Sequence, residues 1–536
     1  MMTNIQPLSK LSERFSRWHN TSRLLCCCVL SALTLLPLTS IHAQSNYVAF
    51  ELKRENNFDP LLTHDINGDG ASDLIVSDYQ PGNGRELLIY LQQPNGSFDA
   101  NPIHVEIKTE IIAVGFADLR PEPGIELVLL ASSGVFSLNA MQSGYAGNLK
   151  QLLSWDLIAS MPNLEQVQFF EGIRDINNDG LADFILPGID SYGIFYGQGN
   201  EQFELVTTLS TINASTEAME RGNTGNEPEA TVSINAEEGI VLQLNSNGRT
   251  PFGTFIEQWQ DTATDPGFLL QSERWMPALL TGHLNNDDLL DLAYLNVGED
   301  GLGQLNIHLQ QSRGYAAQPD WTGSIDTRGQ LSLIDINHDS VLDLLRLRGE
   351  GDDWTAQLFI NKGAQFGLQQ PDQIMRFSGY DVELEFLQLA KDDEPALSVS
   401  YYTIPVVDAI RNASINRTQL LYGSEQKSDE QLFNRRPDFR LEESFSAANV
   451  RGLSEQMSLK YDVDGDGNKD ALYITANGTL AAKKISADLV IADEPFWEYV
   501  SNHTVFQFEV LSLNSDSIPD LLLRHGTSTT MLVGRP

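Results

Sequence analysis

Cysteine is almost missing from this chain. Of its 536 residues only three are cysteines, and Cys26, Cys27 and Cys28 all lie within the first 43 residues. If that stretch is removed on export, the rest of the chain has no thiol, which excludes disulfides and cysteine-based metal sites. The fold must therefore depend on side-chain packing, with metal ions as an additional stabilising element.

Positive charge is also scarce. Lysine and arginine total 34 against 73 aspartates and glutamates, for a formal net charge of −39. The first 43 residues carry four positive charges and one negative, so the remainder carries −42. Such an excess of negative charge repels phosphate backbones and argues against nucleic acid as a partner. It suits a soluble exported protein that binds cations.

Long hydrophobic runs are absent except near the N-terminus. The apolar stretch Leu24–Leu38 is about 15 residues long, whereas a membrane-spanning helix needs about 20. It follows four basic residues and precedes Ile41-His42-Ala43, a pattern typical of a cleaved signal peptide. We therefore expect a signal peptide at 1–43 and a mature chain at 44–536, periplasmic or extracellular at the cell surface, with no transmembrane span after cleavage. The alternative is a membrane anchor.

An acidic nine-residue motif is the clearest feature of the rest. In Asp462–Asp470, aspartates stand at positions 1, 3, 5 and 9, and the apolar run Ala471–Ile474 follows at once. Ca²⁺ takes six to eight oxygen ligands, and a tight loop turns alternate side chains inward. An EF-hand would need a carboxylate at position 12 and flanking helices, but position 12 is Tyr473. The motif therefore predicts a calcium loop that leads into a β-strand.

The motif recurs in strong and in degenerate copies. The strong copies begin at Asp65, Asp175, Asp335 and Asp462. Two weaker copies begin at His283 and Ser512. Two others are more degenerate, and we expect them to hold no ion: Asp118–Glu126, which has Arg120 where position 3 needs a ligand, and Gln388–Ala396, which keeps only Asp392.

The spacing of the copies predicts an all-β propeller. Most copies follow one another by 50 to 57 residues, a period that matches one blade of four short strands. Steps of 108 and 74 indicate a silent unit near Thr231–Leu244 and an insertion around Val406–Arg436. Counting motifs gives eight blades, with seven or nine left open. Pairing of a strand at Tyr47–Leu52 with one at Thr530–Val533 would close the ring and leave no free edge.

These motifs resemble the FG-GAP or VCBS repeat proteins, which include the head of the integrin α-subunit. The resemblance covers nearly all of the mature chain and implies a seven- or eight-bladed propeller whose loops bind Ca²⁺. The Phe-Gly and Gly-Ala-Pro elements of the family are poorly kept, so the VCBS-like variant fits better.

The resemblance and the spacing together assign calcium ligands. Side chains at positions 1, 3, 5 and 9 are Asp65, Asn67, Asp69 and Asp73; Asp175, Asn177, Asp179 and Asp183; Asp335, Asn337, Asp339 and Asp343; and Asp462, Asp464, Asp466 and Asp470. The backbone carbonyl at position 7 is an expected addition, in Ala71, Leu181, Val341 and Asn468. The weaker copies offer Asn285, Asp287 and Asp291, and Asn514, Asp516 and Asp520. About four to six Ca²⁺ ions are expected.

Each assignment has a simpler alternative, an Asx-turn network that needs no metal. Because several carboxylates converge and no basic residue is placed to neutralise them, mutual repulsion favours calcium. Such an ion would stabilise the hairpin and offset negative charge, while a ligand-saturated loop leaves no open position for catalysis.

No catalytic motif is found in the chain, neither Gly-x-Ser-x-Gly nor His-Glu-x-x-His nor a phosphate-binding loop. The repeats therefore favour a monomeric binding or adhesion module with a protein or glycan ligand. The polar stretches Asn213–Glu229 and Arg411–Phe439 are expected to be surface loops that could carry that ligand. The alternative is a polysaccharide lyase or another carbohydrate-active enzyme, which would need a base and a charge neutraliser at the central channel.

Thermal unfolding in excess EDTA and then across a calcium titration tests the metal assignments. We expect the midpoint to rise strongly as about four to six ions bind, because Ca²⁺ binds the folded loops and not the unfolded chain. Calorimetry gives the stoichiometry. An unchanged midpoint, or a single bound ion, would show that most repeats fold on packing alone.

Overall fold

The computed structural model describes most of the chain after the expected signal peptide. The described residues are 47–53, 61–139, 145, 149–157, 163–189, 191–210, 213–220, 242–243, 254–259, 268–297, 301–389, 394–404, 414–424, 432–446, 453, 455–514, 516 and 518–535. The predicted signal peptide at 1–43 lies outside them. Within the described residues the regular structure is β, and no helix is long and apolar enough to cross a membrane.

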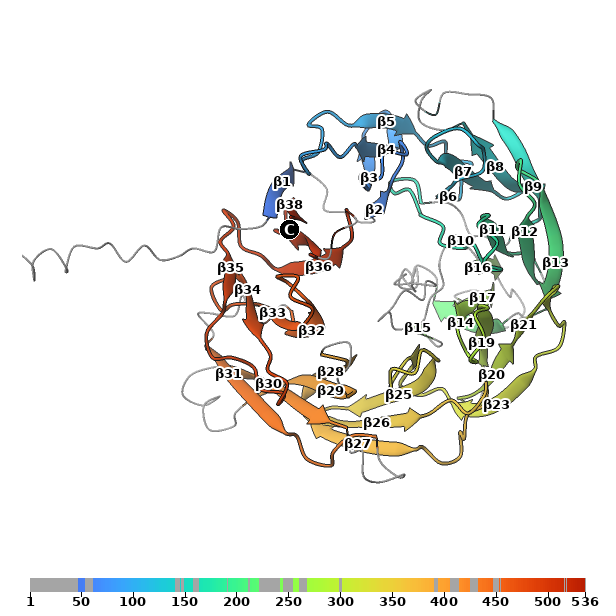
Figure 1. Ribbon diagram of the computed structural model, residues 1–536. Coiled ribbons are helices and arrows are strands. Elements are labelled where there is room, and N and C mark those ends of the chain that lie inside the picture. The colour runs from blue at the N-terminus through green and yellow to red at the C-terminus, as the bar shows by residue number, and fades with distance from the viewer. Residues whose placement is uncertain are drawn as a thin grey trace, which may run out of the picture. The chain divides into compact units, whose positions relative to one another are not determined.

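Eight antiparallel sheets form the blades of a propeller (Figure 1). Blades 1 to 4 are β2 Leu61–His64, β3 Asp73–Gln80, β4 Gly84–Tyr90 and β5 Ile103–Glu106; β6 Ala113–Ala117, β7 Glu126–Ala131, β8 Gly134–Leu138 and β9 Lys150–Ser154; β10 Ile173–Arg174, β11 Asp183–Pro187, β12 Tyr192–Gly197 and β13 Phe203–Leu209; and β18 Leu280–Gly282, β19 Asp291–Val297, β20 Leu302–His308 and β23 Trp321–Asp326.

Blades 5 to 8 repeat the same order of strands. They are β24 Gln330–Ile334, β25 Asp343–Glu350, β26 Asp353–Phe359 and β27 Gln373–Ser378; β28 Tyr380–Leu387, β29 Ala396–Thr403, β30 Ser414–Gly423 and β31 Phe439–Ser446; β32 Ser458–Tyr461, β33 Asp470–Ile474, β34 Leu480–Lys484 and β35 Trp497–Tyr499; and β36 Gln507–Leu511, β37 Asp520–Arg524, β38 Ser528–Gly534 and β1 Tyr47–Lys53. The motif count of eight blades is therefore confirmed.

The remaining strands lie outside this set of four per blade. β14 Asn213–Glu220, β17 Phe268–Trp275 and β16 Thr254–Trp259 form a three-stranded sheet, and β21 Gln310–Gln311 pairs with β22 Gly314–Tyr315. Of the silent unit predicted near Thr231–Leu244, only β15 Leu242–Gln243 is described, and it adds a fifth strand beside β24. The step of 108 residues thus contains an added sheet, while the eight motifs account for all eight blades.

Two stretches predicted to be surface loops contain strands. Asn213–Glu229 begins with β14, which pairs along its length with β17. Arg411–Phe439 contains β30, a central strand of blade 6 in which Arg417 and Thr418 are 2% and 0% exposed. The prediction of loops was wrong there because strand pairing holds these polar stretches in sheets, and in β30 the buried Arg417 forms an ion pair with Glu443.

The hydrophobic core is divided into eight clusters, and each one joins two successive blades. In one of them Ile75 and Leu87 of blade 1 pack with Leu127 of blade 2. In another, Leu52 and Leu522 of blade 8 pack with Leu74 of blade 1, which completes the ring. A blade buries its two apolar faces only against its neighbours, so no blade has a core of its own.

The two ends of the described chain meet in blade 8, as the sequence predicts. β1 pairs antiparallel with β38 from Tyr47–Gly534 to Lys53–Ser528. Figure 1 shows β1 beside β38 at the junction with blade 1, with β2 and β32 toward the centre of the ring and β5 and β31 at its rim. The closure covers the edge that β38 would otherwise expose.

Leu52→Ala tests this closure. Leu52 is 4% exposed in the cluster between blades 8 and 1. Truncating such a side chain is expected to lower the free energy of unfolding by about 2–5 kcal/mol. Chemical denaturation measures the loss. Glu51→Ala is the matched control on the solvent face of the same strand, and its exposed ion pair with His503 is worth about 1 kcal/mol or less. Equal losses in the two variants would contradict a packed closure.

Candidate metal-binding loops

Each nine-residue motif connects the first and second strands of one blade. We call these segments loops 1 to 8, at 65–73, 118–126, 175–183, 283–291, 335–343, 388–396, 462–470 and 512–520. Position 9 is the first residue of the second strand in all eight blades. Position 2 is a buried apolar residue in every loop, from Ile66 in loop 1 to Leu513 in loop 8.

The acid at position 9 is buried and accepts two backbone hydrogen bonds. In loop 1, Asp73 Oδ2 accepts the N–H of Ile66 at 3.1 Å and Asp73 Oδ1 accepts the N–H of Gln92 at 2.8 Å. Asp183, Asp291, Asp343 and Asp520 repeat both bonds, each to position 2 of its loop and to a residue at the end of the third strand. This carboxylate therefore joins the loop to the blade, with or without a metal ion.

Burial raises the pKa of these acids. Loss of water around the carboxylate is the main cause of the increase, and the backbone hydrogen bonds, which favour the ionised form, offset it only in part. The resulting pKa is about 7 for Asp343 and about 6 for Asp73, Asp183, Asp291, Asp470 and Asp520. A nearby cation would favour the ionised form and lower these pKa values.

Positions 1, 3 and 5 converge in loops 1, 3 and 5. In loop 1, Asp65 accepts backbone N–H groups from Gly68, Asp69 and Gly70 at 2.8–3.0 Å. Asn67 accepts the N–H of Asp69, and Asp69 accepts the N–H of position 7. Loops 3 and 5 repeat this pattern apart from the bond from position 4.

The left-handed backbone at positions 4 and 6 makes this convergence possible. Gly68 and Gly70 have φ of +77° and +88°. Loop 5 places His338 and Ser340 in the same region, at +57° and +69°. A side chain on Gly68 would also meet the backbone N of Gly124 in loop 2 at 2.9 Å, so glycine is needed there for a second reason.

Neighbouring loops are joined by their backbones. The N–H of Ser72 donates to the carbonyl of Leu513 in loop 8 at 3.1 Å, and the N–H of Ile125 donates to that of Ile66 at 3.1 Å. Lys469 in loop 7 donates to Leu389 in loop 6 at 2.8 Å. A ligand that fixes the backbone of one loop would therefore also act on the neighbouring loop through these hydrogen bonds.

The three Asp-x-Asn-x-Asp loops have no lysine or arginine of their own among the described residues, although in loop 5 the neighbouring His338 partly offsets the rise in the pKa of Asp335 that burial causes. No lysine or arginine in the described chain forms an ion pair with the acids of loop 1, 3 or 5. Most of their bonded oxygens keep a further lone pair and could hold Ca²⁺, whereas Asp65 Oδ1 already accepts two N–H groups. The same hydrogen bonds form the Asx-turn network that was the alternative to calcium, and metal binding here stays a prediction.

Loop 7 differs, and here the expectation that no basic residue neutralises the acids is wrong. The Nζ atom of Lys484 lies 2.7 Å from Asp464 Oδ2, 2.7 Å from Asp466 Oδ2 and 3.2 Å from Asp470 Oδ1. Lys484 ends β34, where it pairs directly with Asp470 on β33. The register of the sheet places its ammonium group among the loop acids.

Loop 2 also carries its own cation, and it was expected to hold no metal ion. Arg120 at position 3 lies 3.5 Å from Glu126 at position 9 and forms an ion pair with Glu201 of blade 3. Burial opposes the charge of Glu201, but its bonds with Lys150, Ser137 and Arg120 outweigh this and lower its pKa. The guanidinium group thus connects two neighbouring blades.

Loops 4 and 8 are held by hydrogen bonds. In loop 4, His283 Nδ1 lies 3.1 Å from the carbonyl oxygen of Leu289, at position 7 of that loop. In loop 8, Asn514 Nδ2 donates to the carbonyl of Gly534 at 3.1 Å. Both loops keep the bonds among positions 3, 5 and 7. In loop 6, residues 390–393 lie outside the described chain.

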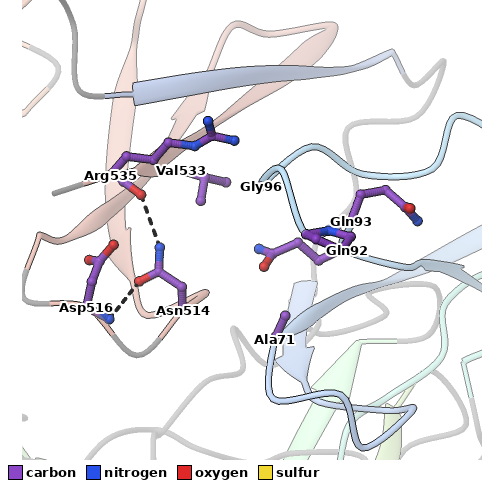
Figure 2. Close-up of a pocket in the computed structure, with 10 residues that line it drawn as sticks. Ala71, Gln92, Gln93, Gly96, Asn514, Asp516, Val533 and Arg535 are labelled. Carbon is purple, nitrogen blue, oxygen red and sulfur yellow. Dashed lines mark hydrogen bonds between the residues drawn. The ribbon is translucent and has the colours of Figure 1, made fainter.

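A cavity of about 400 Å³ lies between loops 8 and 1 (Figure 2). Polar side chains line much of it, including Gln92, Asn514, Asp516 and Arg535. Gln92 is 5% exposed, and its Nε2 atom has no hydrogen-bond partner. Figure 2 shows the amide of Gln92 directed toward the side of the cavity formed by Asn514. A buried donor of this kind can be satisfied by a polar ligand or water.

Three of these features were missed by the sequence reasoning. They are Lys484 in loop 7, Glu201 as the partner of Arg120, and the Gln92 cavity. Aligning the repeats could have found Lys484, because its blade alone ends the third strand in two lysines, Lys483 and Lys484. No local pattern points to Glu201, which lies 81 residues after Arg120.

Arg120→Met tests the cation of loop 2. It removes the ion-pair partner of Glu126, which is 0% exposed, and of Glu201. Glu201 keeps its ion pair with Lys150, but leaving the buried Glu126 without its ion-pair partner is expected to lower the free energy of unfolding by about 3–5 kcal/mol. Arg440→Met is the control, since Arg440 and Glu442 form an exposed pair worth about 1 kcal/mol or less. A loss no greater than the control's, measured by urea denaturation, would contradict this role.

The chain has distant similarity to several solved structures. No protein-family description matches the chain, and no curated protein matches it. A solved structure of an Agrocybe aegerita lectin that recognises non-reducing terminal N-acetylglucosamine is 12% identical, with a TM-score of 0.34 over 82% of this chain and 94% of the lectin. The exotype rhamnogalacturonan lyase YesX is 12% identical, with a TM-score of 0.31 over 91% and 75%. The V. cholerae biofilm matrix protein Bap1 is 13% identical, with a TM-score of 0.20 over 90% and 77%.

Proposed function

We propose that the protein is an exported calcium-binding β-propeller of the FG-GAP/VCBS type that acts as a binding or adhesion module. Its ligand is a protein or glycan in the periplasm or at the cell surface, and it works as a monomer. The observation that carries the metal assignment is the convergence of acids in loops 1, 3 and 5, where no ion pair with a lysine or arginine forms among the described residues.

Calcium in these loops has a structural role in this proposal. The loops connect first and second strands, and position 9 already holds the loop to the third strand. An ion bound by positions 1, 3 and 5 would offset part of the net charge of −39 and would stabilise the folded state by binding it alone. A loop saturated with protein ligands leaves no open position for a substrate.

The cavity between loops 8 and 1 is the proposed contact for a ligand. Gln92 offers an unpaired donor, while Asp516 offers an acceptor and Arg535 further donors. Donors and acceptors set in a mostly apolar lining suit the hydroxyl groups of a sugar better than a purely apolar side chain. This favours a glycan over a protein as the group bound there.

The enzyme alternative receives less support from the central strands. A lyase would need basic groups available to a substrate. On the inner side of blades 6 to 8, Lys460 lies 3.6 Å from Glu385, and Arg524 on β37 lies 2.9 Å from Glu509. These basic groups are paired with acids, which weakens them as neutralisers of an acidic sugar.

A glycan array with and without calcium tests the function, together with Gln92→Met. We expect the full chain to bind a defined set of glycans and Gln92→Met to lose at least about tenfold in affinity, because a lost hydrogen bond to ligand costs about 1.4 kcal/mol or more. Gln369→Met, at an exposed glutamine of blade 5, is the control and should bind normally.

Two outcomes would count against parts of this proposal. Blank glycan arrays and blank pull-downs in calcium would count against a binding module. Glycan binding that Gln92→Met leaves unchanged would move the ligand away from the cavity between loops 8 and 1.

A further inference from the structure

Lys484 occupies the place that the sequence assigns to a metal ion. Its Nζ atom contacts the acids at positions 3, 5 and 9 of loop 7, at 2.7, 2.7 and 3.2 Å. Calcium binds carboxylate oxygens at about 2.3–2.6 Å. An ion that took these same three oxygens would therefore need the space that the ammonium group fills.

Several contacts hold the lysine there. Its backbone is fixed opposite Asp470 by strand pairing, and its Nζ atom lies 4.5 Å from the ring centroid of Phe496. Together with the ion pairs to Asp464 and Asp466, these contacts place the ammonium group among the loop acids.

Asp470 also differs from its counterparts. In loops 1, 3 and 5 the Oδ1 atom at position 9 accepts a backbone N–H, from Gln92, Gly197 and Asn361. Asp470 is 0% exposed, yet its Oδ1 atom has no hydrogen bond and only the 3.2 Å ion pair with Lys484. The lysine supplies the charge compensation that a backbone amide gives elsewhere.

Loops 1, 3 and 5 have no third-strand residue that could act in the same way. Continuing the strand register by one residue places Leu91, Tyr196 and Ile360 opposite position 9 of these loops. None of them carries a positive charge. In loop 7 the third strand brings a cation to this point, whereas in loop 2 the cation, Arg120, comes from the loop itself.

We infer that Lys484 is the resident cation of loop 7 and excludes calcium from it. Loop 7, which has the most carboxylates, is then stable without a metal ion. The acids remain suited to an ion once the lysine is removed, since oxygens of Asp462, Asp464 and Asp470 all lie within 4.8 Å of one another. This inference rests on the proposed function only for the identity of the excluded ion.

Calcium stoichiometry of the full chain, stripped with EDTA and followed by equilibrium dialysis, tests the inference. Lys484→Met is expected to bind one more Ca²⁺ per chain than the unchanged protein. In EDTA its unfolding midpoint should fall, and calcium should restore it. Lys362→Met is the control, because Lys362 forms an exposed pair with Asp372 away from the loop acids. It should leave the stoichiometry unchanged.

The difference between the two stoichiometries decides the question. If Lys484→Met gains no ion, the inference is overturned, whatever the unchanged protein binds. If the unchanged protein binds none and Lys484→Met binds one, the inference stands and the calcium assignment of loops 1, 3 and 5 fails.

Crystals of the unchanged protein soaked in terbium give a test that does not depend on the variant's folding. Anomalous peaks that leave loop 7 empty while other loops are filled would support the inference, and a peak within loop 7 would overturn it. A crystal with no peak in any loop would overturn the assignment of loops 1, 3 and 5 and would leave loop 7 empty as inferred.

Discussion

The buried acid at position 9 is the interaction on which seven of the eight blades depend. A carboxylate inside a protein is costly unless donors surround it, and in blades 1, 3, 4, 5 and 8 two backbone N–H groups do so, one from the loop and one from the end of the third strand. In blades 2 and 7 a basic side chain takes the place of the second N–H. Asp73 shows both bonds. The acid therefore determines where the second strand begins and how the loop lies over it. Only blade 6 has another residue there, Ala396.

A strongly acidic chain must also supply positive charge near its loops. Two loops do this with cations of the chain itself, Arg120 in loop 2 and Lys484 in loop 7. In loop 4, a ring nitrogen of His283 meets the carbonyl at position 7 directly. Loops 1, 3 and 5 keep the acids without such a group, which is why calcium is proposed there. The repeat thus keeps one backbone conformation, while the groups that compensate the negative charge of its acids differ from loop to loop.

The packing of the ring explains why the repeats cannot be treated one at a time. Each of the eight hydrophobic clusters lies between two blades, and the last lies between blades 8 and 1. Backbone bonds between neighbouring loops follow the same order. A blade removed from the ring would expose both apolar faces, so the blades must fold as one cooperative unit, unlike an open array whose end repeats are capped.

The sequence by itself determined the repeat, the eight blades, the strand that follows each loop and the closure of Tyr47–Lys53 on the last strand. These features follow from local patterns that recur at one spacing. Only the tertiary structure decided which charges meet. Lys484 reaches Asp466 across 18 residues through strand register, and Arg120 reaches Glu201 across 81 through the contact of two blades. Composition and spacing do not record register or blade contacts. The sequence therefore predicts a metal site in an acidic loop even where a lysine of the same blade already neutralises the acids.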